Sequence, residues 1–331
     1  LHQDLAQGSA APPRHRQRLR HLRLRQQAIP RRLDNAILVS IDLQRVLELT
    51  GVRTIMMTND PFDETERPYW QTGQPVVERF RAALRLDTLL VGWDRAVGQL
   101  NQMGYSVQPD LSGETMDQVR RFLDDWIGRM RPVYLAASLP PTFRYPDNSP
   151  TTGLLERCVL PAARDHGLAF AMMIGVRRQV NPQLRLAGDA LGRADINAVL
   201  NLCSAHPDNR FLLTVLSREN QHETVVAARK FRNLHIFGCW WFVNVPTLTE
   251  EITRMRVELL GHSFTPQHSD ARVLEQLIYK WHDARQMLAR VLADKYSALA
   301  EAGWRLTEQQ IHQEVADLLG GSAMRFLTGR T

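Results

Sequence analysis

The chain has 331 residues, of which 44% are hydrophobic, so it is long enough to bury one large core. This length fits a single (β/α)8 barrel of about 250 residues with additional segments, and it leaves two ordinary domains open. The net charge of +6 is concentrated in residues 1–32, which hold eight arginines and one acid, so the remainder is close to neutral. A nucleic-acid-binding patch could lie only in that tract, and we expect no nucleic-acid partner elsewhere.

The N-terminal tract differs in composition from everything that follows it. From Pro12 to Arg32 it has no glycine, aromatic or acidic residue, and arginine stands at nearly every second position from Arg14 to Arg20. A transit peptide, an arginine-rich nucleic-acid arm and a non-native stretch, such as a coding region read in a shifted frame, are three interpretations of this composition. We therefore expect residues 1–42 to form an atypical segment, separate from residues 43–331.

Short apolar strands alternate with longer amphipathic stretches from residue 43 onward, as in a parallel β/α fold. The predicted strands are Thr54–Asn59, Arg81–Leu86, Val133–Leu139, Ala169–Gly175, Phe211–Ser217, His235–Trp240 and Ser263–Ser269. Helices are predicted over residues 117–130, 220–231 and 247–261, where apolar residues recur at three- and four-residue steps. Seven strands, where a closed barrel has eight, indicate a TIM-type (β/α)8 barrel that lacks its first strand, unless one strand is not recognisable from the pattern.

Polar residues follow these strands, where the active site of a barrel would lie. Arg85 stands inside an apolar strand, which is costly unless a carboxylate or an anion meets it. Asp60 precedes Pro61 and is more typical of a turn former than of a catalytic acid. Arg178 follows the fourth strand and Arg218 the fifth, where a helix-capping surface position is an equally good interpretation of Arg218.

The three cysteines, Cys158, Cys203 and Cys239, are widely spaced and lie in apolar runs, as small buried hydrophobes do. This pattern is typical of a reducing compartment. The chain contains no apolar run of about 18 residues, the length that a membrane span needs. Its N-terminus also lacks the apolar stretch of a secretory signal. We expect a cytoplasmic protein without a membrane partner.

The stretch from Gly238 to Trp281 is the most informative one. A short apolar run there ends on Asp270, with Arg272 two residues later, and Trp240 closes the preceding strand. Indoles beside polar groups are typical walls of carbohydrate-sized pockets, whereas Asp-x-Arg alone is often only a surface ion pair. In a barrel, Asp270 and Trp240 would converge on one rim with four arginines, which favours a small anionic, hydroxyl-rich substrate. Those arginines are Arg85, Arg178, Arg218 and Arg272.

Several motifs in the chain resemble those of the uronate (glucuronate) isomerases. They are MTNDPFDE, ALRLD, AFAMMIGV, LSRENQHE, GCWWF and TRMRVELLGHSFTPQHSDARVLEQLIYKW, followed by DKY and AGW, and they cover about residues 43 to 331. The resemblance implies a barrel of the amidohydrolase type. It also implies interconversion of D-glucuronate with D-fructuronate, and of D-galacturonate with D-tagaturonate, in uronate catabolism. The resemblance is compatible with a homo-oligomer but does not imply one.

The resemblance also implies roles for individual residues. Asp270 resembles the last-strand aspartate that approaches a divalent metal, zinc in complete members, and shuttles a proton. Arg272 resembles its substrate-binding partner, Arg85 the arginine that holds the sugar acid, and Trp240 the wall of the pocket. An aldose–ketose shift needs such an acid/base group and a stabilised oxyanion.

The chain departs from the family pattern at the metal site. No two histidines are two residues apart, so the family's His-x-His motif is missing, as is a His-Tyr pair. Met173 stands where many members carry a histidine, and His268 fits a hydrogen-bonded structural residue. We therefore expect weak metal binding and doubtful turnover. A metal-dependent hydrolase on the same barrel and an inactive fragment remain as alternatives.

Overall fold

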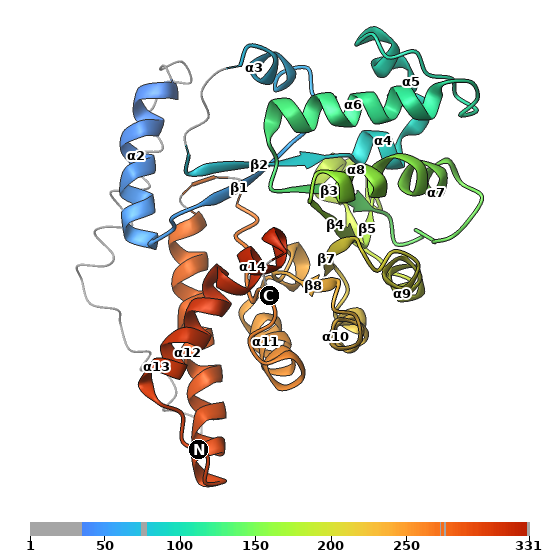
Figure 1. Ribbon diagram of the computed structural model, residues 1–331. Coiled ribbons are helices and arrows are strands. Elements are labelled where there is room, and N and C mark those ends of the chain that lie inside the picture. Colours follow the sequence, from blue (N-terminus) through green and yellow to red (C-terminus); the bar gives the residue numbers. More distant parts are fainter. Residues whose placement is uncertain (1–34, 74–77, 272, 275, 330–331) are drawn as a thin grey trace. The chain divides into compact units, whose positions relative to one another are not determined.

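The computed structural model describes residues 35–329 apart from 74–77, 272 and 275 (Figure 1). The chain divides into two compact units, Leu1–Leu49 and Thr50–Thr331. The described part of the first unit lies in helix α2 (Asn35–Thr50). The arginine-rich tract falls outside the described residues. None of the described helices is long and apolar enough to cross a membrane.

The second unit is built on a six-stranded sheet in which every neighbouring pair is parallel (Figure 1). Its strands are β1 (Ile55–Asn59), β2 (Phe80–Arg85), β3 (Tyr134–Leu139), β4 (Ala169–Ile174), β7 (Arg210–Val215) and β8 (Leu234–Ile236). They follow one another across the sheet in chain order. Sequential parallel strands with intervening helices are the arrangement of a (β/α)8 barrel, so the predicted fold class is confirmed.

The seventh predicted strand, Ser263–Ser269, was wrong in extent. Only Thr265 pairs there, through a single parallel bridge to Phe237. Pro266 follows at once and has no N–H to donate, so the ladder stops after one residue. Among the described residues, no strand connects this bridge with the outer edge of β1.

Helices separate the strands along the chain. They are α3 (Arg67–Gln71), α4 (Asp87–Val91), α5 (Trp93–Gln102), α6 (Thr115–Met130), α7 (Pro150–Leu154), α8 (Leu160–Asp165), α9 (Ile196–Ala205), α10 (Gln221–Lys230) and α11 (Pro246–Leu260). After the last strand follow α12 (Gln276–Glu301), α13 (Glu308–Ala316) and α14 (Ser322–Thr328). The short strands β5 (Val176–Arg177) and β6 (Ala190–Leu191) form an antiparallel pair after β4. The three predicted helices correspond to α6, α10 and α11.

Successive side chains of the sheet point to opposite faces and build two cores. On one face, Leu84 and Phe170 are fully buried in a large cluster that also contains Phe122 of α6. The other face is lined by small residues and is packed against α14. This second cluster contains Ala136, Ala169, Ala171, Leu212 and Leu327. The three cysteines are free and buried, as predicted.

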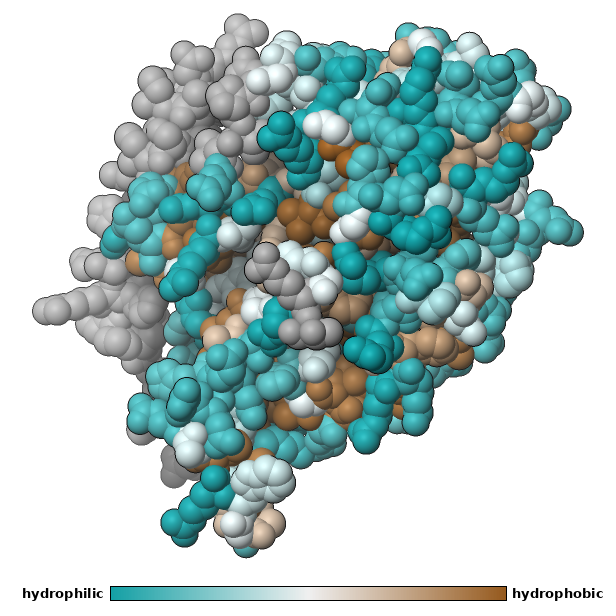
Figure 2. Space-filling view, in the orientation of Figure 1, coloured by the Kyte–Doolittle hydropathy of each residue, from teal (hydrophilic) through white to brown (hydrophobic). Residues whose placement is uncertain are grey.

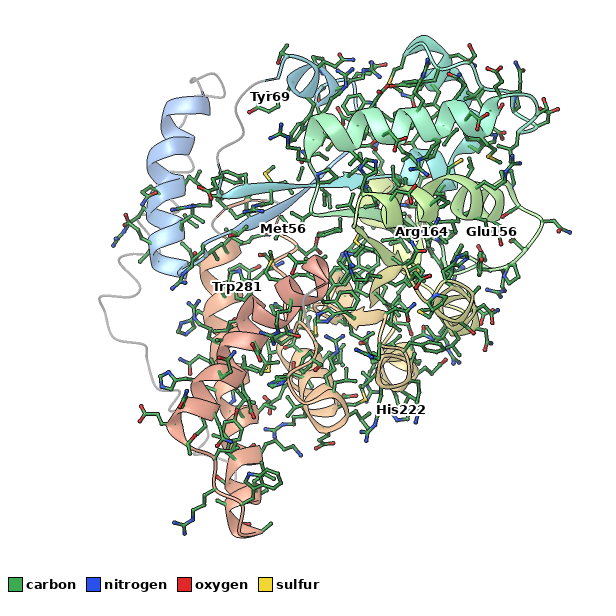
Figure 3. All side chains as sticks on the ribbon, viewed as in Figure 1. Met56, Tyr69, Glu156, Arg164, His222 and Trp281 are labelled. Atoms are coloured by element: carbon green, nitrogen blue, oxygen red, sulfur yellow. The ribbon has the colours of Figure 1, made fainter. Side chains whose placement is uncertain are left out.

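Exposed residues on the face seen in Figure 2 are mostly hydrophilic, with smaller hydrophobic areas between them. Strand β1 is less buried than the central strands. Met56, labelled in Figure 3, is partly buried, and Met57 is 43% exposed, whereas Ala83 and Leu84 of β2 are fully buried. The strand pairs only with β2 in the described part of the chain. Unpaired strand edges recruit other chains.

We therefore predict that the purified 331-residue chain self-associates through β1. Light scattering should show a mass that rises with protein concentration. A Met57→Lys variant, which puts a charge on the exposed side of the strand, should reduce the effect. A monomeric parent with sharp, reversible unfolding would contradict the prediction and indicate that another segment covers β1.

Candidate active site

Arg85, at the carboxyl end of β2, is held by a carboxylate. Its Nη2 donates to Asp87 Oδ2 at 2.6 Å, and Asp87 Oδ1 accepts from the backbone N–H of Ser138 at 2.8 Å. The ends of β2 and β3 are thereby joined. The carboxylate partner expected for an arginine in an apolar strand is present. Nε of Arg85 is buried and has no hydrogen-bond partner among the described residues, whereas the side chain as a whole is 34% exposed, so an anion can reach the exposed part of the guanidinium.

Further acidic groups surround this arginine. Glu66 Oε2 accepts from Asn59 Nδ2 and from the backbone N–H of Asp60, both at 3.1 Å. Burial disfavours the charged form of Arg85, but the hydrogen bond to Asp87 and the nearby Asp60 and Glu66 outweigh it and raise the pKa of Arg85. Arg85 therefore stays protonated. It is a fixed cation at the carboxyl edge of the sheet.

Asp60 forms the predicted turn, because its Oδ1 accepts from the backbone N–H of Phe62 at 2.9 Å. Burial raises the pKa of the Asp60 carboxyl above its usual value, despite the opposing effect of that hydrogen bond. A raised folded-state pKa means that ionisation of Asp60 costs stability. The cost is absent below the unfolded pKa of about 3.9 and grows as the pH rises through the folded pKa.

Asp60→Asn is accordingly predicted to stabilise the fold at pH 7, since the amide keeps the turn's acceptor and removes the charge. Urea unfolding of parent and variant should show a higher midpoint for Asn at pH 7. The difference should vanish at about pH 3.9 and below. An equal or lower midpoint at pH 7 would show that the Asp60 charge is favourable, through Arg85.

Trp240 forms part of an apolar wall at the same edge of the sheet. It is 8% exposed and packs in a cluster with Val176, Leu216, Met173 and Trp241. These residues come from β4, from the segments after β4 and β7, and from the loop after β8. The indole thus connects three neighbouring strand ends, and its role as the wall of a sugar pocket stays a prediction.

Asp270 lies on the segment after the Thr265 bridge. It is exposed, with a left-handed φ of 42°. Lys280 of α12 holds its backbone, because Nζ donates to the carbonyls of Ser269 at 2.5 Å and Asp270 at 3.1 Å. The carboxylate itself is not used for this anchoring. Arg272, its predicted partner, lies outside the described residues.

His268 was expected to be a hydrogen-bonded structural residue. Its Nε2 is buried and finds no partner in the described part of the chain, and the ring packs against Phe237 with centroids 5.6 Å apart. Burial lowers the pKa of His268 to about 4, so the ring is neutral at pH 7. Gly238 makes room for it, because a Cβ there would lie 1.7 Å from the ring's Cδ2.

The other two arginines already have carboxylate partners. Arg178 Nη1 donates to the buried Asp189 at 2.6 Å, and Arg218 is paired with Glu251 of α11 through two nitrogens. Both members of the second pair are about half exposed, at 58% and 46%. Among the described residues, no hydrogen bond or ion pair joins Arg85, Arg178 or Arg218 to Asp270. Arg178 and Arg218 stay predictions as substrate ligands.

A divalent metal does not fit the described residues. No three of their histidine, cysteine, aspartate and glutamate side chains come together as a metal-binding group. Metal sites in proteins ordinarily use three or more such ligands. Asp270 therefore has no second or third ligand beside it among the described residues.

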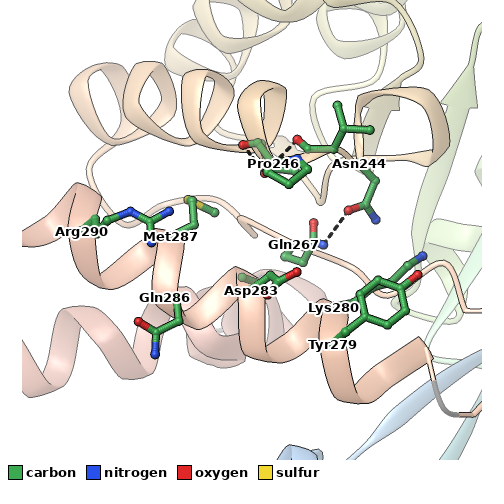
Figure 4. Close-up of a pocket in the computed structure, with 12 residues that line it drawn as sticks. Asn244, Pro246, Gln267, Tyr279, Lys280, Asp283, Gln286, Met287 and Arg290 are labelled. Carbon is green, nitrogen blue, oxygen red and sulfur yellow. Dashed lines mark hydrogen bonds between the residues drawn. The ribbon is translucent and has the colours of Figure 1, made fainter. Parts of the chain in front are cut away.

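Sequence reasoning missed a cavity of about 320 Å³ between α11 and α12 (Figure 4). Gln267 lies in its wall and donates from Nε2 to Asn244 Oδ1 at 2.9 Å. Lys280 lines it too and connects it with the backbone of Asp270. The other lining residues are Val245, Pro246, Thr249, Tyr279, Asp283, Ala284, Gln286, Met287 and Arg290. They share no spacing in the sequence that would have revealed them.

Comparisons with known proteins gave no matching family model and no matching curated protein. Among solved structures, a uronate isomerase from Bacillus halodurans C-125 is 51% identical, with a TM-score of 0.86 over 88% of this chain and 69% of that one. A uronate isomerase from Thermotoga maritima is 16% identical, with a TM-score of 0.69 over 86% and 69%. Glucuronate isomerase from Caulobacter crescentus is 18% identical, with a TM-score of 0.61 over 84% and 65%. The last two matches support the fold alone.

Proposed function

The chain belongs to the uronate isomerase family, and from that membership we propose that it interconverts D-glucuronate and D-fructuronate as an aldose–ketose isomerase. The observation that carries the proposal is the 51% identity to the Bacillus halodurans enzyme over 88% of this chain. We extend it to D-galacturonate and D-tagaturonate. We place the reaction in the cytoplasm, where the three free thiols would stay reduced.

Arg85 is assigned to the carboxylate of the hexuronate. Its side chain is 34% exposed, and Asp87 holds the guanidinium through Nη2. A planar guanidinium that is already oriented can bind a carboxylate with little further loss of side-chain freedom, which preserves binding energy for orientation of the sugar. Trp240 forms the apolar wall beside the sugar ring.

Asp270 is assigned to proton transfer between C2 and C1, which passes through an enediol. Its carboxylate is exposed and free of the Lys280 anchor, so a substrate can reach it. Arg272 would stabilise the negative charge that develops on the substrate oxygen.

The proposal is tested by following substrate panels with proton NMR. D-glucuronate should give D-fructuronate, and D-glucose, which lacks the carboxylate held by Arg85, should not react. Glucuronolactone and simple esters serve as substrates for the hydrolase alternative. Hydrolysis of these compounds without isomerisation of D-glucuronate would replace the isomerase by a hydrolase, and no reaction at all would favour the inactive fragment.

A further inference from the structure

Arg256 of α11 is a buried cation without an acidic partner among the described residues. The whole residue is 1% exposed, and its hydrogen-bond acceptors are neutral. Nη1 donates to the carbonyl of Gly238 at 2.8 Å and to that of Thr265 at 3.5 Å. Nη2 donates to Gln221 Oε1 at 3.1 Å. The guanidinium therefore binds the residues that follow β8 and the bridging residue of the next segment.

Gln221, at the start of α10, extends these contacts to a third strand. It is 2% exposed, and its Nε2 donates to the carbonyls of Val215 at 3.1 Å and Ser217 at 3.2 Å. Val215 is the last residue of β7. Two buried side chains from neighbouring helices thus bind main-chain carbonyls at the ends of β7, β8 and the Thr265 segment.

Burial of this cation is unfavourable. Desolvation lowers the pKa of the Arg256 guanidinium, and a buried charge is unfavourable unless other groups compensate it. An apolar side chain would fill the same space at lower cost. A guanidinium can, however, bind acceptors in different directions from one rigid plane, which neither an apolar residue nor a lysine can do. Arg256 therefore contributes by fixing the relative positions of the groups that it binds.

The bound carbonyls lie close in sequence to the residues assigned to the substrate. Gly238 precedes Trp240 by two residues, and Thr265 precedes Asp270 by five. The left-handed conformation of Gly238 brings the chain against the His268 ring at this point. A shift of the Gly238 carbonyl would therefore move the Trp240 loop and the His268 segment together.

We propose that Arg256 and Gln221 form a buried clamp that fixes the carboxyl ends of β7, β8 and the Thr265 segment, and that they act as positioning residues for Trp240 and Asp270. The consequence for hexuronate binding rests on the proposed function. The clamp itself does not, because it is defined by contacts within the protein.

Hydrogen exchange measured by mass spectrometry on the full 331-residue chain tests the clamp. The amide of Gly238 donates to the Thr265 carbonyl at 2.8 Å, and the amide of Thr265 donates to the Ile236 carbonyl at 3.0 Å, so both report the clamped segments. Arg256→Met keeps a long side chain without donors. Exchange over residues 236–245 and 263–270 should become about tenfold faster, while peptides of β3 and β4 keep the parent's rates.

Two further variants separate positioning from packing. Arg256→Lys keeps the charge and one donor and should restore part of the protection that Arg256→Met loses. Arg254→Met, on the same helix, removes a surface side chain paired with Glu250 and Asp294 and should change neither segment. Exchange that is unchanged in Arg256→Met, equally fast throughout the sheet, or fully restored to the parent's rates in Arg256→Lys would overturn the clamp.

If Arg256→Met does not fold, Gln221→Met tests the clamp in its place. Hydrogen exchange in this variant should become faster over residues 215–218 and 236–238. Titration of the folded variants with D-glucuronate adds the functional readout. The dissociation constant should rise about tenfold in Gln221→Met and less in Arg256→Lys. Parent-like affinity in Gln221→Met would overturn the positioning role. Absence of binding by the parent would count against the proposed function, and the exchange rates would then decide the clamp alone.

Discussion

Asp270→Asn is expected to lower kcat for D-glucuronate by about 10²–10⁴-fold, the usual contribution of a general acid/base group. The variant is best made in a chimera that joins the N-terminal part of the Bacillus halodurans enzyme to residues 50–331, because turnover is then high enough to measure the loss. Asparagine keeps the shape but cannot take up the proton. It also tolerates the left-handed φ of 42°, and the Lys280 contact is to the backbone, so the fold should be retained.

Arg272→Lys in the same chimera should be severe too, because lysine keeps the charge but loses the planar fork that binds two oxygens. Circular dichroism and the urea midpoint control for folding. If both variants turn over D-glucuronate within a few-fold of the chimera, Asp270 and Arg272 form an ordinary surface pair, and the catalytic assignment fails with them.

Arg85→Met is expected to raise KM for D-glucuronate by about 10- to 100-fold, since a charge-assisted hydrogen bond contributes about 1.5–3 kcal/mol and 1.4 kcal/mol corresponds to tenfold. The change removes the only group assigned to the sugar carboxylate. It also leaves Asp87, 19% exposed, without its cation, so the free energy of unfolding should fall. Steady-state kinetics of the chimera separates the effect on KM from that on kcat.

Arg193→Met is the matched control for this experiment. It removes the same chemical group from an exposed ion pair with Glu223, where little stability is expected to depend on it. Its KM should stay within a few-fold of the parent value. A rise in KM as large for Arg193→Met as for Arg85→Met would show that the loss does not come from a contact of Arg85 with the sugar carboxylate.

The strands could be predicted because apolar runs of five or six residues alternate with polar loops. Prediction failed where one residue decided the outcome, at Pro266, which interrupts an otherwise suitable run. A hydrophobic pattern does not register the loss of a single backbone donor.

The hydrogen-bond partners in the candidate site were predictable where the two residues lie close together in the sequence. The partner of Arg85 is two residues away, and the cost of an arginine in an apolar strand indicated that one was needed. The partner of Arg178 is Asp189, brought close by the pairing of β5 with β6, and that of Arg218 lies on α11. Arg256 was missed altogether, since a buried arginine and an exposed one look alike in a helical pattern.

Metal content and turnover of the 331-residue chain, measured on one sample, test the central claim most directly. The claim is that this chain carries the substrate-binding part of a uronate isomerase without a metal-binding group among its described residues. After incubation with zinc or manganese and removal of the excess, we predict well below one bound ion per chain. D-fructuronate should form far more slowly than with the Bacillus halodurans enzyme. One tightly bound ion per chain, together with turnover equal to that of the relative, would contradict the account.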